Sequence, residues 1–259
     1  VSVLNNRTDA DDEANKKRPA EENADNTAKR KKKNKNVAEP ILIRSHSEAE
    51  QTNSDATEHQ LDEREKENQL SKVSELFSDG KVLLAQGKYA EAIKPYQEAL
   101  DIQLQVLGDF NLKVALTYVA IGTTLFCQHK CEESMKMHEK ALKIQLDKLG
   151  CRHEDVASSY HHMGCILKFQ AKYKEAMEMF RQALDIYLEV HGNRHEDVAN
   201  TYHEMGIALY CQVKYKEAVE MFRKFLDIYV EVDGEGHEKV LNARKLVAKG
   251  LELLGQHGE

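Results

Sequence analysis

The first 76 residues of this chain contain no phenylalanine, tyrosine or tryptophan, and the first aromatic side chain is that of Phe77. No apolar run approaches the roughly 18 residues that a membrane-spanning helix needs. Nothing from residue 73 to 259 alternates apolar and polar residues as a strand would. The N-terminal part therefore lacks the side chains for a core, and the remainder is expected to be helical.

The cysteines are odd in number and scattered, at positions 127, 131, 151, 165 and 211. Because no signal peptide is recognised either, we expect reduced thiols and an intracellular protein. The sequence also lacks a glycine-rich phosphate loop, a nucleophile elbow and paired carboxylates beyond solvated helix faces. We therefore predict no enzyme activity, no cofactor and no small-molecule substrate.

Charge divides the chain into segments of different kinds. With 44 acidic and 37 basic residues the net charge is −7, which argues against a general nucleic-acid binder. Residues 1–60 have one short apolar patch, Ile41–Ile43, and bury too little surface to offset the entropy of ordering. We predict a disordered tail over 1–60 and a charged lead-in helix over 61–72.

From residue 73 to 259 the sequence repeats with a period of 42 residues. Residues 155–196 and 197–238 are identical at 27 of 42 positions. A period between about 20 and 50 residues is typical of a solenoid. Two glycine series keep the spacing, namely Gly80, Gly122, Gly164 and Gly206, and Gly108, Gly150, Gly192 and Gly234. We place repeats at 73–114, 115–156, 157–198 and 199–240, and a capping helix at 241–259.

Each repeat is predicted to form two helices joined by a short turn. In the third repeat, apolar residues recur at helical spacing on both sides of the sequence QAKY, and Gly192 follows as a C-cap. A glycine inside a helix costs about 1 kcal/mol relative to alanine, so its recurrence indicates close contact between paired helices, as between Gly164 and Ala176. The predicted fold is all-α, a solenoid of about four and a half helix-turn-helix repeats.

These motifs resemble the tetratricopeptide repeat. The matching residues are the first-helix aromatics Tyr118, Tyr160 and Tyr202, the turn tyrosines Tyr89, Tyr173 and Tyr215, and the small residues Ala92, Ser134, Ala176 and Ala218. The period, the sequence KYKEA and the linkers of the form G…HEDVA resemble repeats of the kinesin light chain type in particular. The resemblance covers residues 73–259 and implies that the α-solenoid is right-handed. The long heptad helix of those light chains is not recognised in residues 1–72, so the resemblance does not extend to motor attachment.

Histidines and cysteines in CQHKC (127–131) and CRHED (151–155) suggest a metal site, but their repeat positions favour structural roles. Cys127 aligns with Phe169, an apolar position, and His138 stands where other repeats carry tyrosine or phenylalanine. One position is shared by the linker histidines His153, His195 and His237. Because metal ligands rarely follow a repeat position while being exchanged for aromatic residues, we predict no metal.

The resemblance implies that the first helices line a concave groove for peptide segments of other proteins. The predicted groove residues are Leu116, Val119, Thr123, Phe126, Ser158, His161, Cys165, Lys168, Asn200, His203, Ile207, Tyr210, Lys245 and Lys249. Several are apolar and not needed for the core, namely Leu116, Val119, Phe126, Ile207 and Tyr210, which favours binding over a solvated face. The lysines predict a positive bias, and His161 and His203 predict tighter acidic binding as pH falls through about 6.5.

Two basic clusters lie ten residues apart in the tail, and their members are Lys16, Lys17, Arg18, Lys29, Arg30, Lys31, Lys32 and Lys33. This spacing resembles bipartite nuclear import signals of the nucleoplasmin type, which fit two acidic pockets on an import receptor. Nucleic acid or a membrane would also attract the charge, but neither requires a fixed gap, and no aromatics are interleaved for stacking. A solvated run without function is the remaining alternative. Ser45 and Ser47 lie in a context suited to phosphorylation.

The sequence thus predicts a nuclear scaffold or adaptor, which could shuttle to the cytoplasm, that binds partner proteins in the groove and an import receptor through residues 16–35. Neither a membrane nor a nucleic-acid partner is expected. Two alternatives stay open. One is a cytoplasmic cargo adaptor like the kinesin light chains, and the other is a regulator associated with an enzyme or nucleic-acid complex.

Overall fold

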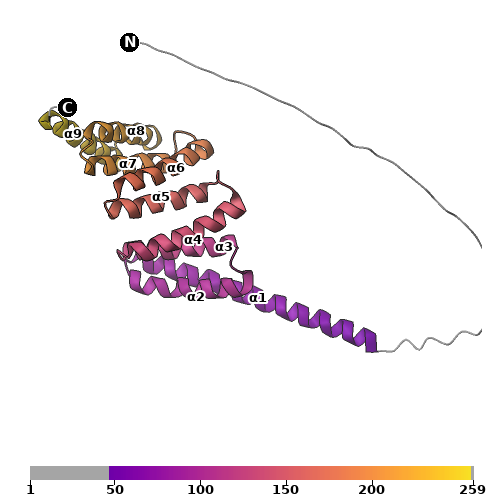
Figure 1. Cartoon of the computed structure of the whole chain (residues 1–259). Coiled ribbons are helices and arrows are strands. Elements are labelled where there is room, and N and C mark those ends of the chain that lie inside the picture. Colours follow the sequence, from indigo (N-terminus) through magenta and orange to yellow (C-terminus); the bar gives the residue numbers. More distant parts are fainter. Residues whose placement is uncertain (1–46, 258–259) are drawn as a thin grey trace, which may run out of the picture. The chain divides into compact units, whose positions relative to one another are not determined.

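A computed structural model describes residues 47–257 of the chain, shown in Figure 1. The described residues form helices and no strand, which confirms the all-α prediction. The helices are α1 (Ser47–Ala85), α2 (Tyr89–Leu107), α3 (Leu112–Cys127), α4 (Cys131–Leu149), α5 (Glu154–Phe169), α6 (Tyr173–His191), α7 (Glu196–Cys211), α8 (Tyr215–Asp233) and α9 (Glu238–His257). None of the helices in this range is long and apolar enough to span a membrane.

Helical hairpins stack in chain order from α1 to α9 (Figure 1). Within a repeat, α3 packs against α4, α5 against α6, and α7 against α8. Between repeats, the second helix of one hairpin contacts the first helix of the next, as in α4 on α5 and α6 on α7. The first helices also touch directly, α3 with α5 and α5 with α7, so their exposed residues share one surface.

Helix α1 is longer than the sequence predicted. It begins at Ser47, within the segment 1–60 predicted as tail, and it joins the predicted lead-in helix 61–72 to the first helix of repeat one. Residues 47–72 contain no glycine or proline and are rich in glutamate and glutamine. No helix-breaking residue therefore stands before the part of α1 that packs on α2. The described side chains from Asp62 to Lys72 are mostly exposed.

The first helices start three residues earlier than the predicted repeat boundaries at 115, 157 and 199, because the linker residue just before each helix is its N-cap. The side chain of Asn111 accepts a hydrogen bond from the backbone N–H of Lys113 at 2.9 Å. His153 Nδ1 accepts from the N–H of Asp155 at 3.1 Å, and His195 and His237 cap in the same way. The structural role predicted for the linker histidines is confirmed.

The glycine of each first helix faces the aromatic position of the second helix. A Cβ atom built on Gly164 would lie 2.6 Å from Cε1 of Phe180, closer than carbon atoms approach without strain. Tyr96 and Phe222 oppose the glycines of repeats one and four, and in repeat two the ring of His138 takes this place against Gly122. The predicted close contact between paired helices is confirmed. At the far end of the hairpin, Gly192 has a φ of +77° and caps α6 as predicted.

The buried core is continuous only in the C-terminal part of the solenoid. One cluster runs through α5 to α9, from Val156 to Ala243, and includes Phe180 and Phe222. Repeats one and two hold two smaller clusters, one around Val114 and Ile144 and the other around Tyr96. Repeats one and two are therefore held together by less buried apolar surface than repeats three and four and the last helix.

Candidate peptide-binding groove

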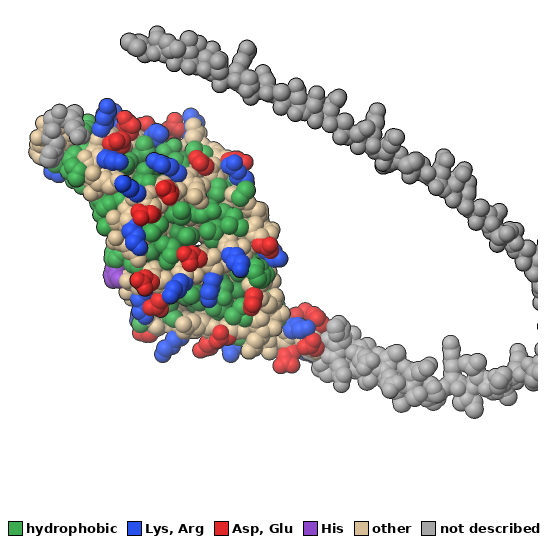
Figure 2. Space-filling view, in the orientation of Figure 1, with side chains coloured by type: hydrophobic (Ala, Val, Ile, Leu, Met, Phe, Trp, Pro, Cys, Tyr) green, Lys and Arg blue, Asp and Glu red, His purple; other side chains and the backbone are tan. Residues whose placement is uncertain are grey.

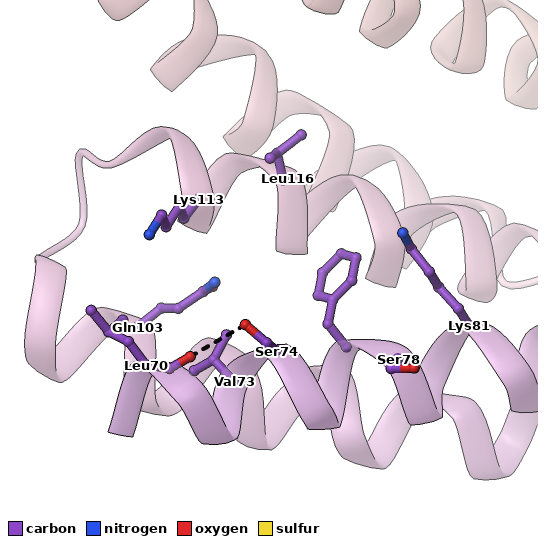
Figure 3. Close-up of a pocket in the computed structure, with 9 residues that line it drawn as sticks. Leu70, Val73, Ser74, Ser78, Lys81, Gln103, Lys113 and Leu116 are labelled. Atoms are coloured by element: carbon purple, nitrogen blue, oxygen red, sulfur yellow. Dashed lines mark hydrogen bonds between the residues drawn. The ribbon is translucent and has the colours of Figure 1, made fainter. Parts of the chain in front are cut away.

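The surface formed by the first helices has a cavity at its N-terminal end, between α1, α2 and α3 (Figure 3). Its volume is about 390 Å³. It is lined by Leu70, Val73, Ser74, Phe77, Ser78, Lys81, Gln103, Lys113 and Leu116. Of the predicted groove residues, Leu116 lies here, with half of its surface exposed. The lining residues contributed by α1 were missed because the predicted groove residues begin in repeat two, although Leu70, Val73 and Phe77 have the spacing of one helix face.

The rim of this cavity is basic. In Figure 3 the side chains of Lys81 and Lys113 lie on either side of Leu116. The ammonium group of Lys81 lies 5.2 Å from the centre of the Phe77 ring, which places a positive charge over an aromatic face. Apolar walls with an ammonium group on each side would hold an apolar group bearing neighbouring negative charge.

Farther along the surface, Phe126 packs edge-to-face against Phe169, with ring centres 5.8 Å apart. Phe169 is 54% exposed, so this aromatic pair from α3 and α5 presents apolar surface next to the predicted groove. Thr123 is half-buried on the same helix as Phe126.

Several residues predicted to be free for binding contribute to the core instead. Val119 packs against the cluster around Val114, and Cys165, Ile207 and Tyr210 pack against the large C-terminal cluster. The prediction that Val119, Ile207 and Tyr210 are not needed for the core was wrong. The first helices of neighbouring repeats are in contact. Side chains that would be exposed in a single repeat therefore pack against the next repeat.

The histidines in the middle of the surface are mostly buried and neutral. Burial, helped by the neighbouring His162, lowers the pKa of His161 to about 4, although Glu204 opposes the shift. His161 Nδ1 lies 3.2 Å from the hydroxyl of Thr201, and His162 Nδ1 lies 2.7 Å from the carbonyl oxygen of Ser158. The prediction that His161 titrates near 6.5 was wrong because the imidazolium would lose its hydration in this position.

The predicted positive bias is largely cancelled. Lys168 pairs with Glu204, whose carboxylate also contacts His203, and Lys249 pairs with Glu252. Burial raises the pKa of Glu204, but hydrogen bonding to His203 and the charge of Lys168 outweigh it and hold the pKa at about 2. Burial next to this carboxylate also raises the pKa of the Cys165 thiol to about 12. Blue and red side chains are intermixed on the face drawn in Figure 2.

The remaining predicted residues are dispersed. Asn200 accepts a hydrogen bond from the hydroxyl of Tyr229 at 3.1 Å, and Lys245 is exposed on α9. The basic clusters between residues 16 and 35 and Ser45 lie outside the described residues. Ser47 is the first residue of α1, and its side chain is not described.

Comparison with known families decides the assignment. The family model for the tetratricopeptide repeat matches three overlapping ranges, 80–147, 113–189 and 155–230, which together span more than half of the chain. The chain belongs to the tetratricopeptide repeat family. Each matched range begins in the first helix of a repeat or at its start, so this repeat protein carries at least three units of the family's pattern in succession.

Solved structures share the fold at low identity. BtubC (BKLC) from P. vanneervenii is 18% identical, with a TM-score of 0.65 and coverage of 80% of this chain and 82% of that one. A putative kinesin light chain from Podosopora anserina is 18% identical, with a TM-score of 0.62 and coverage of 72% and 89%. Aspartyl phosphate phosphatase F from Bacillus subtilis is 16% identical, with a TM-score of 0.59 and coverage of 80% and 56%. Comparison with curated protein sequences gives no match.

Proposed function

We propose that this tetratricopeptide repeat protein is an interaction scaffold that binds segments of other proteins and has no catalytic role of its own. The observation that carries the proposal is the cavity between α1, α2 and α3 with its apolar walls and two rim lysines. Its volume of about 390 Å³ lies within the range of ligand pockets, which runs from roughly 300 to 1,000 Å³.

The ligand that fits this cavity is an extended or helical segment with one large apolar or aromatic side chain and acidic residues beside it. The apolar side chain would enter between Phe77 and Leu116, and the carboxylates would meet Lys81 and Lys113. The buried anchor supplies most of the affinity, while the charges set orientation and speed association. We expect dissociation constants in the micromolar range.

Selection from a random peptide library with the full chain as bait tests this proposal. Selected peptides should share an aromatic or aliphatic residue next to aspartate or glutamate. Leu116→Glu, which places a carboxylate in the cavity, should weaken binding at least ~10-fold. Glu178→Lys on the exposed side of α6 is the control and should leave binding unchanged. Loss of binding in Glu178→Lys together with full binding by Leu116→Glu would place the ligand elsewhere and contradict the proposal.

We also propose that the protein acts in the nucleus and exchanges with the cytoplasm. The support is the spacing of the two basic clusters, Lys16–Arg18 and Lys29–Lys33, on a chain that is acidic as a whole. Residues 1–40 should carry a fluorescent protein that is too large for passive entry into the nucleus. Alanines in either cluster should weaken import, because receptor binding through two linked clusters is cooperative.

Shortening the ten-residue gap at constant charge is the decisive control. Import that survives this change would show that total charge alone is read, and the bipartite signal would then be wrong. A fusion that stays cytosolic would instead favour the second candidate function, a cytoplasmic cargo adaptor. That candidate is supported by the likeness of the repeats to those of the kinesin light chain type.

A further inference from the structure

A cluster of two imidazoles and two carboxylates lies at the junction of the third and fourth repeats, away from the groove cavity. His191 is the last residue of α6, His195 and Asp197 open α7, and Glu154 opens α5. His191 Nε2 lies 3.3 Å from the Glu154 carboxylate and 3.9 Å from that of Asp197. His195 Nδ1 lies 3.3 Å from the same oxygen of Asp197. The His191 and His195 rings are stacked with centres 4.0 Å apart.

The distances suit a metal ion. The ligand atoms of His191, His195 and Asp197 all lie within 4.8 Å of one another. A tetrahedral ion with bonds of about 2.0–2.1 Å keeps its ligand atoms roughly 3.3–3.4 Å apart, so small side-chain rotations would close these three around it. Mixed imidazole and carboxylate ligands suit zinc and neighbouring divalent transition metals.

At the next junction, between the fourth repeat and α9, a lysine occupies one of the corresponding positions. One repeat later, Lys239 stands at the position of Asp197, Glu196 at that of Glu154, and Tyr229 at that of Tyr187. The Lys239 ammonium pairs with the Glu196 carboxylate and lies 3.0 Å from the hydroxyl of Tyr229. A cation is thus built into the later junction, whereas Asp197 adds a second carboxylate to the earlier one.

The earlier junction instead gathers negative charge around one imidazole. Oxygen atoms of the Glu154 and Asp197 carboxylates lie 3.3 and 3.9 Å from His191 Nε2. The two carboxylates therefore create a potential at this place that favours a positive ion.

We propose that His191, His195, Asp197 and Glu154 bind a divalent transition-metal ion, with Zn²⁺ as the best fit, at the junction of repeats three and four. His195 would coordinate through Nδ1 and give up the 3.3 Å hydrogen bond that it accepts from the backbone of Asp197. The ion would join α5, α6 and α7, three helices from two successive repeats, and so tie the repeats together. The linker histidines share a capping role, and His191 adds the second imidazole at this one junction.

The chain supplies the matched substitutions for a test. Leucine stands at the position of His191 in the second repeat, as Leu149, and asparagine caps the helix at Asn111, the position of His195 in the first linker. His191→Leu and His195→Asn should therefore keep the fold and remove a ligand. His153→Asn is the control, because His153 is a capping histidine whose repeat has Leu149 in place of a second imidazole.

The full chain, reduced and freed of metal, is titrated with Zn²⁺ by calorimetry. The wild type and His153→Asn should each bind one Zn²⁺ ion at this site. His191→Leu and His195→Asn should lack that ion or bind it at least ~10-fold more weakly. Addition of Zn²⁺ should raise the melting temperature of the wild type and of His153→Asn more than that of His191→Leu and His195→Asn. Equal stoichiometry, affinity and thermal response in all four proteins would overturn the proposal.

Asp197→Lys gives a second readout that does not depend on a destabilised variant. Its ammonium should pair with Glu154 as Lys239 pairs with Glu196, so the melting temperature without metal should hold or rise while the Zn²⁺ response disappears. Crystals soaked in Zn²⁺ should show anomalous density between His191 and Asp197. A retained response in Asp197→Lys, or bound zinc only at other positions, would refute the site.

Discussion

His138 offers the sharpest test of the forces in this solenoid. It is fully buried in the slot where repeats three and four carry Phe180 and Phe222, and neither of its ring nitrogens has a hydrogen-bond partner. Its ring stacks on that of His162 with centres 5.0 Å apart. Burial, with the neighbouring His162, lowers the pKa of His138 to about 3. His138→Phe should therefore stabilise the protein, because a buried polar ring is replaced by the apolar ring that the fold uses elsewhere.

The gain should depend on pH. Near pH 7.5 it reflects the unpartnered nitrogens, and a buried unsatisfied polar group costs about 1–3 kcal/mol. Because the folded pKa lies below the unfolded value of about 6.5, His138 destabilises the wild type as pH falls through 6.5 towards 3. At pH 5, which is about 1.5 units below 6.5, this costs about 2 kcal/mol more. The gain from His138→Phe should therefore be about 3–5 kcal/mol at pH 5.

Urea denaturation of the full chain at pH 7.5 and pH 5.0 measures both values. His129→Asn is the control, because His129 is exposed and its φ of +61° is one that asparagine tolerates. The control should show no comparable pH-dependent gain. Equal gains from His138→Phe at both pH values would show that the buried imidazole is not held neutral. A loss of stability at pH 7.5 would show that the slot in repeat two is not an aromatic slot.

Three further changes test the helix pairs and the buried charges. Gly164→Ala should lower the free energy of unfolding, measured in urea, by about 1–3 kcal/mol. Adding Phe180→Leu to this variant should restore part of the lost stability, because the smaller side chain makes room for the new methyl group. If the losses from the two substitutions simply add, the strain lies elsewhere. Gly192→Ala should lower the free energy of unfolding by about 1 kcal/mol in the same assay, because a φ of +77° disfavours a residue with a side chain. No other atom lies near enough to clash with the added methyl group. An unchanged free energy would mean that the helix cap relaxes to another conformation. Lys168→Ala should cost more than the double variant Lys168→Ala with Glu204→Ala, because it leaves a half-buried carboxylate without the Lys168 ammonium. The excess should fade below about pH 4.5, because loss of Lys168 raises the pKa of Glu204 above its wild-type value of about 2 and lets the carboxylate protonate. A larger cost for the double variant would refute the pairing.

The fold could be predicted from the sequence because the residues that determine each helical hairpin recur in four repeats. Gly164 marks the close helix contact and Gly192 marks the end of the second helix, and each recurs at a spacing of 42 residues. His138 was also placed correctly, since alignment with Phe180 is enough to assign its slot. These features depend on contacts within one hairpin, whose residues lie close in the sequence.

The surface was harder to read because it depends on contacts between hairpins. Lys168 meets Glu204 and His161 meets Thr201, and these partners come from different repeats. Alignment of repeats shows which residues share a position but not which residues of adjacent repeats touch. The cavity was missed as well, because its walls come partly from α1, where Val73 and Leu76 stand at the positions of Ala115 and Tyr118 and the repeat's alanine and tyrosine markers are missing.

The uneven core has a consequence for how the chain responds to a partner. Since stability in a solenoid is roughly the sum of unit and neighbour terms, α5 to α9 should act as one cooperative unit whose amide protons exchange last. The helices that line the cavity, α1 to α3, rest on the two small clusters and should open locally at lower free energy. A ligand bound in the cavity would suppress this local unfolding. Hydrogen exchange of the amides in α1 to α3 would therefore slow on binding and would detect the ligand more sensitively than any change in the mean structure.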